Sequence, residues 1–258
     1  MTKFSANLGF LFTEHALPDA IRAARAAGFD AVECHWPYDT SLSEVKVALE
    51  ETGLPMLGLN TRRGHVERGE NGLAALPGRE KDARAAIDEA LDYAAGIGAG
   101  NVHVMAGFDE SKAGERTFMA NLTYACDQAS RNGITILIEP LNRHDAPGYF
   151  LKTTDQAAGI IAAVGAPNLK LMFDCYHVGR TEGDLITRLR NLLPIVGHIQ
   201  FASVPDRGPP DRGEINYNAV FSEVDALGWS TPLGAEYKPG GVTELTLDWL
   251  KSAQNKSP

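Results

Sequence analysis

Apolar segments of strand length alternate with amphipathic segments of helix length along the whole chain. The apolar segments lie near residues 4–12, 31–36, 55–61, 101–107, 134–142, 169–177, 196–204 and 232–237. Apolar residues recur with a helical period in the stretches 18–27, 42–52, 79–95, 115–132, 153–164, 184–193, 217–227 and 243–253. The two kinds of segment predict eight strands that alternate with eight helices.

Glycines mark the ends of most of the expected helices. The residue just past a helix often adopts a left-handed conformation, which glycine accepts without steric strain. Glycines stand between a helical stretch and the next strand at Gly28, Gly53, Gly98, Gly133, Gly165 and Gly228. The helix boundaries drawn from periodicity therefore have independent support.

Four successive strands of the series end in a polar residue. These residues are Glu139 in ITILIEP, Asp174 in LKLMFDCYH, Gln200 in VGHIQFA and Glu236 in PLGAEYKP. They are 35, 26 and 36 residues apart, and each separation is about the length of one strand–helix–strand unit. In a closed barrel of such units all strands end at the same rim, so the four side chains would converge there.

The predicted fold is therefore a (β/α)8 TIM barrel. An open doubly wound sheet would not bring four successive strand ends around one point. The length of 258 residues fits one such barrel, which typically has roughly 250 residues. No linker or change of composition divides the chain, so we expect a single domain over residues 1–258.

The same four residues predict a metal site. Glu139, Asp174 and Glu236 supply carboxylates and Gln200 supplies an amide oxygen, the donors that a hard divalent cation prefers. We therefore expect Mg²⁺ or Mn²⁺ as cofactor. The alternative is four unrelated polar strand ends, but four oxygen donors in consecutive units favour the metal site.

Composition argues against several other classes of protein. The net charge of −9 gives no basic field for nucleic acid. No apolar stretch approaches the roughly 20 residues that span a bilayer, and the N-terminus lacks a signal-peptide pattern. The three cysteines form no CxxC motif, which suits reduced thiols and disfavours cysteine-bound zinc. We expect a cytoplasmic protein without a nucleic-acid or membrane partner, and homo-oligomer formation is left open.

Three further residues are candidates for substrate binding. His177 follows Asp174 at the expected start of a loop, and Lys238 lies two positions beyond Glu236. Arg207, seven residues after Gln200, can hold an anionic group through paired hydrogen bonds. For each of them the alternative is a solvated side chain on a surface loop.

Two connections are too long and polar for simple turns, and both follow the carboxyl end of a strand. They cover residues 62–78 and 205–216, and such loops are usually lids or binding loops. The second also contains Arg212. The role of the first loop and of its His65 is left open. Glu33 is expected to support the site or the interior, and His35 is not assigned a role.

A divalent cation held by carboxylates, with no nucleophilic serine or cysteine in a recognisable setting, favours proton transfer next to a carbonyl. The cation would polarise the carbonyl and stabilise an enediolate. Glu139 and Glu236 lie on the first and last of the four strands, so they would flank the substrate and carry the proton.

The chain resembles the hydroxypyruvate isomerase family in several motifs. These are FSANL at 4–8, PYD at 37–39, LPGRE at 76–80, IEPLN at 138–142, DCYH at 174–177, GHIQ at 197–200, DRGEINY at 211–217 and EYKP at 236–239. The resemblance implies interconversion of hydroxypyruvate and 2-hydroxy-3-oxopropanoate. It also implies metal ligands at Glu139, Asp174, Gln200 and Glu236, with both glutamates acting as acid and base, and substrate contacts at His177 and Arg207.

Other activities remain open on the same scaffold. The nearest is isomerisation of a longer acid, a 2-oxo-tetronate, by a member of the same family. A ketohexose 3-epimerase fits less well, because those enzymes typically have histidine where Gln200 stands. A catalytically silent sugar-acid binding protein is a further alternative, since a fold by itself does not establish activity.

Overall fold

The computed structural model describes residues 2–254. These residues form two compact units, which are described one at a time. The first unit comprises residues 2–57, 174–191 and 199–254, and the second comprises residues 58–173 and 192–198. Strands alternate with helices through both units, as the sequence predicts.

In the first unit four strands lie in the order β2-β1-β8-β7, and neighbouring strands pair in parallel. Their bounds are Phe4–Asn7 for β1, Ala31–Glu33 for β2, Leu233–Ala235 for β8 and Val196–Phe201 for β7, of which the last residues belong to this unit. Gln200 stands opposite Gly234 in the register. This pairing brings the end of β7 beside β8, which is followed directly by Glu236.

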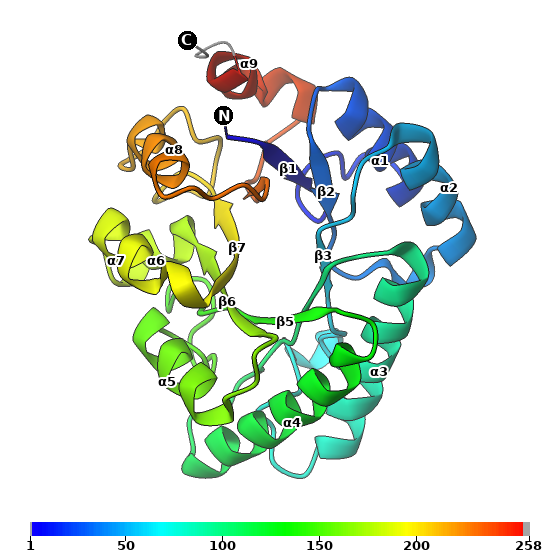
Figure 1. Ribbon diagram of the computed structural model, residues 1–258, viewed down its shortest axis with the longest axis vertical. Coiled ribbons are helices and arrows are strands. Elements are labelled where there is room, and N and C mark those ends of the chain that lie inside the picture. The colour runs from blue at the N-terminus through cyan, green and yellow to red at the C-terminus, as the bar shows by residue number, and fades with distance from the viewer. Residues whose placement is uncertain (1, 255–258) are drawn as a thin grey trace. The chain divides into compact units, whose positions relative to one another are not determined.

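The helices of the first unit are mostly short. They are α1 (Leu17–Ala26), α2 (Leu42–Thr52), α6 (Cys175–Thr181), α7 (Leu185–Leu192), α8 (Tyr217–Ala226) and α9 (Asp248–Gln254), with 3-10 turns at Pro37–Asp39 and Thr243–Thr246. Figure 1 shows α1 and α2 side by side. The buried positions of α1, Ala20, Ile21 and Ala24, recur at helical spacing. The amphipathic period therefore identifies its packed face.

Aromatic rings hold the first unit together. Phe4 of β1 packs edge-on against Phe201 of β7, Phe221 of α8 and Trp249 of α9, with ring centroids 5.9, 5.1 and 5.2 Å apart. All four rings are buried. Edge-to-face pairs contribute about 0.5–1.5 kcal/mol each beyond the burial of their area. The cluster thus ties two strands to the helices that follow β7 and β8.

In the second unit the strand order is β3-β4-β5-β6, again with parallel pairings. The strands are Gly58–Asn60 (β3), Asn101–His103 (β4), Thr135–Ile138 (β5) and Leu169–Asp174 (β6), of which the last residue belongs to the first unit. The helices are α3 (Glu80–Ile97), α4 (Lys112–Ser130) and α5 (Thr154–Val164), with 3-10 turns at Val66–Arg68 and Leu193–Ile195. The two long helices α3 and α4 lie side by side (Figure 1).

The termini of the helices follow the local sequence. Ser111 and Thr153 cap α4 and α5 by accepting hydrogen bonds from the backbone N–H of Gly114 and Gln156, each 3.1 Å long. Such caps satisfy donors that have no partner within the helix. All six glycines expected past helix ends have a positive φ, as predicted.

Three expectations about local structure are wrong. The strands are shorter than their apolar segments; β1 ends at Asn7, and residues 8–14 form turns in which Leu11 and Phe12 are buried. The residues after Asp174 form α6 instead of extending a strand or starting a loop, because the Asp174 carboxylate caps a helix there. The last helical stretch is divided into a 3-10 turn and α9.

Within residues 2–254, no helix has both the length and the apolar character needed to cross a membrane.

Candidate active site

Three of the four predicted ligands lie in the first unit. Asp174 is the last residue of β6, Gln200 lies near the end of β7, and Glu236 follows β8 directly. All three side chains are buried. Buried polar and charged groups need hydrogen-bond or ion-pair partners. The partners of these three side chains therefore define the chemistry of this part of the protein.

Asp174 lies where a strand becomes a helix. One carboxylate oxygen, Oδ1, accepts a hydrogen bond of 2.8 Å from the backbone N–H of Tyr176. The other, Oδ2, is 3.6 Å from a guanidinium nitrogen of Arg207 and 3.6 Å from Nε2 of His177. Burial raises the pKa of Asp174 to about 7, against the opposing charge of Arg207. Without a bound cation, Asp174 is thus only partly ionised at neutral pH.

Glu236 has the opposite electrostatic setting. Its Oε1 accepts hydrogen bonds from Nδ2 of Asn7 at 3.0 Å and from Nε2 of His35 at 2.9 Å, and its Oε2 accepts one from Arg207. Burial acts to raise the pKa of Glu236, but Arg207 and His35 outweigh it and hold the pKa at about 2. Glu236 is therefore ionised at neutral pH. Because a carboxylate only accepts, His35 carries its proton on Nε2.

Arg207 comes from the loop after β7 and contacts two aromatic rings. Its guanidinium lies 4.7 Å from the ring centroid of Phe10 and 4.9 Å from that of Tyr176. Cation–π contacts of this kind add to the hydrogen bond with Glu236. The backbone of Arg207 has φ of 56°, a conformation that costs free energy for a residue other than glycine. Its carbonyl accepts a 2.7 Å hydrogen bond from the N–H of Lys238.

The donor set of the first unit suits a divalent cation. Oδ2 of Asp174 and Oε1 of Gln200 are buried, and neither accepts a hydrogen bond from any residue between 2 and 254. Buried oxygens of this kind rarely stay without a partner. The carboxylates of Glu33, Asp174 and Glu236 also outnumber the one guanidinium among them. A hard cation such as Mg²⁺ or Mn²⁺ would coordinate these oxygens and compensate the excess negative charge.

Glu139, the fourth predicted ligand, belongs to the second unit. It follows β5 directly and is buried, and its Oε2 lies 3.7 Å from Nδ1 of His103 on β4. Its convergence with Asp174, Gln200 and Glu236 stays a prediction.

The other candidates differ in their surroundings. His177 is buried on α6 rather than on the expected loop. Lys238 contributes its backbone to the Arg207 contact, while its side chain is exposed. Arg212 is 60% exposed and pairs with Asp206 at 3.0 Å. Substrate contacts through His177, Arg207 and Lys238 stay predictions.

The sequence did not identify two residues that contact Glu236. The strand pattern assigns His35 no role, and Asn7 occurs only within the motif FSANL. A signal for His35 was present, because Glu33 and His35 are two positions apart at the end of a strand, as side chains on one face are. Asn7 ends β1 as Gln200 nearly ends β7, but a single asparagine at a strand end carries little information.

The His35 ring depends on a glycine. A Cβ added to Gly9 would lie 2.1 Å from Nδ1 of His35, so the ring occupies the space that a side chain there would need. The ring also packs edge-on against Phe10, with centroids 5.4 Å apart. Gly9 and Phe10 thus fix the place from which His35 reaches Glu236.

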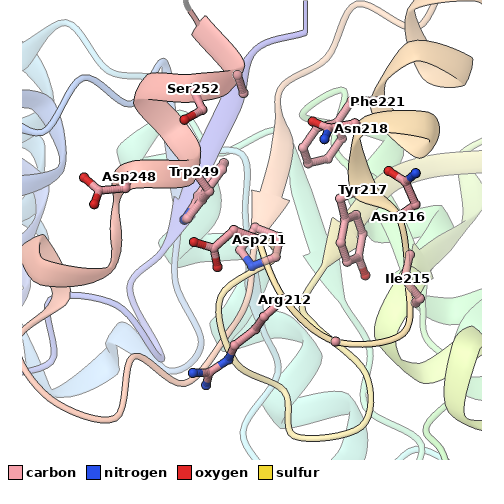
Figure 2. A pocket seen from close by; sticks show the side chains of 13 residues that line it. Asp211, Arg212, Ile215, Asn216, Tyr217, Asn218, Phe221, Asp248, Trp249 and Ser252 are labelled. Atoms are coloured by element: carbon pink, nitrogen blue, oxygen red, sulfur yellow. The ribbon is translucent and has the colours of Figure 1, made fainter.

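A pocket of about 430 Å³ lies elsewhere in the first unit, between the loop 210–216, α8 and α9. Figure 2 shows Trp249 and Phe221 on opposite sides of it, with Asp211 and Arg212 from the loop. None of the predicted metal ligands or substrate-binding residues lines this pocket. It is therefore separate from the cluster around Glu236.

Parallel strand–helix repeats, with carboxylate, amide and guanidinium groups where the strands end, define a (β/α) enzyme of the barrel class. The chain belongs to the xylose isomerase-like TIM barrel family, which matches residues 21–253. Membership confirms the predicted fold class.

Relatives of known name agree with this assignment. The chain is 45% identical to the 2-oxo-tetronate isomerase of Cupriavidus necator, covering 97% of this chain and 98% of that protein. It is 36% identical to the hydroxypyruvate isomerase of Escherichia coli, covering 97% and 98%. A solved structure from Brucella melitensis, described as an AP endonuclease of family 2, is 38% identical with a TM-score of 0.94, covering 98% and 99%. The chain is thus an enzyme of the isomerase class, as predicted.

Proposed function

We propose that this enzyme is a divalent-metal-dependent isomerase that moves a carbonyl group between adjacent carbons of a short hydroxylated oxo acid. The observation that carries the proposal is the cluster of the first unit. It joins an ionised carboxylate, Glu236, to two buried oxygens that lack hydrogen-bond partners and to an immobilised guanidinium, Arg207. The relatives named as isomerases support the reaction class.

The proposed metal ligands are Glu139, Asp174, Gln200 and Glu236. When bound, Mg²⁺ or Mn²⁺ would polarise the substrate carbonyl and stabilise negative charge on the neighbouring oxygens. The residues themselves move the proton. Glu236 and Glu139 are the proposed pair that removes the proton from the hydroxyl-bearing carbon and returns it to the former carbonyl carbon, through an enediolate of the substrate.

Arg207 is proposed to bind the substrate carboxylate. Guanidinium groups form paired hydrogen bonds with carboxylates, and the rings of Phe10 and Tyr176 already hold this one in place. An anionic substrate would compete with Glu236 for the guanidinium. Because Arg207 lowers the pKa of Glu236, this competition would raise that pKa and make Glu236 a better base once substrate is bound.

The proposed substrate is hydroxypyruvate, converted to 2-hydroxy-3-oxopropanoate. In that reaction C3 loses a proton and C2 gains one, while the hydroxyl proton passes from the oxygen on C3 to the oxygen on C2. A 2-oxo-tetronate is the second candidate, favoured by the 45% identity to an isomerase of that name. Both acids carry the carboxylate that Arg207 would bind.

A substrate panel with metal control tests this proposal. Purified enzyme is freed of metal with a chelator and assayed with hydroxypyruvate, 2-oxo-tetronates, fructose and an unrelated ketose. We expect no turnover until Mg²⁺, Mn²⁺ or Co²⁺ is added, and then turnover of an oxo acid. Full activity in demonstrably metal-free enzyme would contradict the metal assignment, and preference for fructose would contradict the substrate class.

Solvent deuterium tests the route of the proton. Turnover in D₂O should place deuterium on the carbon that receives the proton, although shielded transfer between the two glutamates would lower the amount. Intramolecular hydride transfer would instead leave carbon-bound deuterium absent from the product at every stage of the reaction. Full transfer of the C3 deuterium of labelled substrate to C2, with no uptake from solvent, would favour hydride transfer over the enediolate.

A further inference from the structure

We propose that Glu33 is a positioning residue that fixes the orientation of the Gln200 side-chain amide, so that Gln200 offers its oxygen and not its NH₂ group to a divalent cation. The inference rests on the proposed metal-dependent function and adds a residue to it. Glu33 is buried on β2 and is not among the predicted ligands.

A glutamine ligand has a problem that a carboxylate ligand lacks. The two ends of its amide are nearly equal in size, but only the oxygen can bind a cation, whereas the NH₂ group donates hydrogen atoms. A half-turn about the last bond of Gln200 would therefore replace a ligand with a repulsive group. Something outside the amide has to select one of the two orientations.

The orientation of the amides is set first by a backbone N–H group, which can only donate a hydrogen bond. The N–H of Gly9 donates a 2.9 Å hydrogen bond to Oδ1 of Asn7. This contact fixes the oxygen end of the Asn7 amide, so its NH₂ group faces the other way. There it donates to Oε1 of Glu33 at 2.9 Å and to Oε1 of Glu236 at 3.0 Å. Both glutamates thus act as acceptors.

Glu33 fixes the orientation of the Gln200 amide in the same way. Its Oε1 also accepts a 2.7 Å hydrogen bond from Nε2 of Gln200. Because this oxygen already accepts from the NH₂ group of Asn7, it can hold the NH₂ end of Gln200 but not its oxygen end. Oε1 of Gln200 therefore points away from Glu33. It is buried and accepts no hydrogen bond within the described part of the chain, as a cation ligand would be before binding.

The neighbouring strand leaves room for this contact. Gly234 on β8 stands opposite Gln200 in the register. A Cβ on Gly234 would lie 2.6 Å from Oε1 of Glu33 and 2.9 Å from Cγ of Gln200. The Glu33–Gln200 pair thus occupies the volume that any side chain at position 234 would take.

The test is a Mn²⁺ titration of the full chain, followed by electron paramagnetic resonance, with unfolding curves for every variant. Glu33→Met removes the acceptor, and we expect Mn²⁺ to bind about 10–100-fold more weakly. Glu33→Gln loses the same negative charge but keeps an acceptor oxygen. It should therefore bind Mn²⁺ about tenfold more tightly than Glu33→Met. Equal Mn²⁺ affinity of these two variants would overturn the proposal.

A carboxylate at position 200 separates orientation from general support. Glutamate has two equivalent oxygens, so Gln200→Glu needs no orienting partner. In that background Glu33→Met and Glu33→Gln should have Mn²⁺ affinities within about twofold of each other. Residue 33 then no longer decides which group of residue 200 faces the cation, so the two substitutions should not interact through amide orientation. A gap as large as in the Gln200 background would show that Glu33 only supports the fold, and the proposal would fail.

Gly234→Ala provides an independent test if Glu33→Met does not fold. The added methyl group would displace the Glu33 carboxylate, so Mn²⁺ affinity should fall about tenfold or more. Gly159→Ala is the matched control, because a Cβ there meets no atom within 4 Å. Unchanged affinity in a folded Gly234→Ala variant would count against the proposal.

The outcomes also separate this inference from the proposed function. If the wild-type chain binds no Mn²⁺, or Gln200→Ala binds it as tightly as wild type, the ligand assignment fails and the role of Glu33 fails with it. If Gln200→Ala weakens Mn²⁺ binding and Glu33→Met does not, the metal site stands and only the role of Glu33 is overturned.

Discussion

The tripeptide Asp-Arg-Gly occurs twice in the loop after β7, at residues 206–208 and 211–213. The first arginine, Arg207, is 13% exposed, contacts two aromatic rings and forms an ion pair with Glu236. The second, Arg212, is 60% exposed, pairs with Asp206 and lines the pocket of Figure 2. The same three residues thus give a buried ion pair in one copy and a solvated one in the other.

The difference lies in what surrounds each copy. Asp206 accepts hydrogen bonds from Ser203 and from the N–H of Gly208, which closes a tight turn and directs Arg207 inward. Exposed ion pairs contribute about 0–1 kcal/mol, whereas breaking a buried pair leaves an uncompensated charge and costs about 3–5 kcal/mol. Function should therefore depend on the first copy and be almost indifferent to the second.

The largest effect is expected at the carboxylate that Arg207 bonds. Glu236→Gln keeps the size of the side chain and an oxygen donor but removes the proton acceptor. We expect kcat at saturating metal to fall about 10²–10⁴-fold. Glu214→Gln, an exposed glutamate beside the second copy, is the matched control and should retain wild-type kcat. Near-wild-type turnover by Glu236→Gln would place the proton transfer elsewhere, with His177 next to be examined.

A conservative change in each copy sharpens the comparison directly. Lysine keeps the charge of arginine but not its planar set of donors or its stacking faces. Arg207→Lys should lower kcat/KM about 10–100-fold, mainly through a higher KM, because a point charge replaces paired hydrogen bonds to an anionic substrate. Arg212→Lys should leave both constants unchanged. Equal losses in the two variants would mean that burial does not distinguish the copies.

Substitution of Asp174 measures how much its buried carboxylate, near Arg207, lowers the free energy of unfolding. Burial raises the pKa of Asp174 from 3.8 to about 7, so ionising it disfavours the folded state above pH 7 and not below pH 4. In chelator at pH 8, Asp174→Asn should raise the free energy of unfolding by roughly 1–3 kcal/mol, since one unit of pKa is about 1.4 kcal/mol. The gain should vanish near pH 4 while Mn²⁺ affinity falls. A destabilised variant at pH 8 would show that the contact with Arg207 outweighs burial.

The smallest effect is expected from the rings that hold Arg207. Phe10→Leu keeps the apolar bulk but removes the π face, and such contacts contribute about 0.5–1 kcal/mol near the surface. We therefore expect kcat/KM to fall about two- to fivefold. Val242→Leu, a change at an exposed apolar residue of the same unit, should have no effect. A loss as large as that of Arg207→Lys would make the ring itself a substrate contact.

The sequence predicts the fold class and the placement of strands and helices well, because apolar period and glycine position are local signals. It overestimates strand lengths, since the apolar residues after Asn7 are buried in turns and not in the sheet. It misses α6, because the helix is only seven residues long and the polar residue before it also fits a metal ligand. The first error arises where tertiary packing overrides a local pattern, and the second where a short local cap is overlooked.

For the candidate site, strand ends identify Asp174, Gln200 and Glu236 but not their partners. His35 lies two positions past the end of β2, so its spacing from Glu33 is only a weak signal for the direction of its side chain. The tripeptide itself does not distinguish Arg207 from Arg212, and only the distance of seven residues from Gln200 favours Arg207. Such differences depend on contacts between residues far apart in the sequence, such as Phe10 with Arg207.

Gly9 limits how this enzyme can be redesigned. Directed evolution often alters specificity by enlarging side chains in the loops around a substrate, and the turn after β1 is an obvious target for such libraries. Position 9 is closed to that strategy, because even a methyl group would have to displace the imidazole of His35 and so disturb its hydrogen bond to Glu236. Diversity introduced there should yield inactive clones, whereas exchange at position 10, whose side chain is only partly buried, should lower activity only modestly.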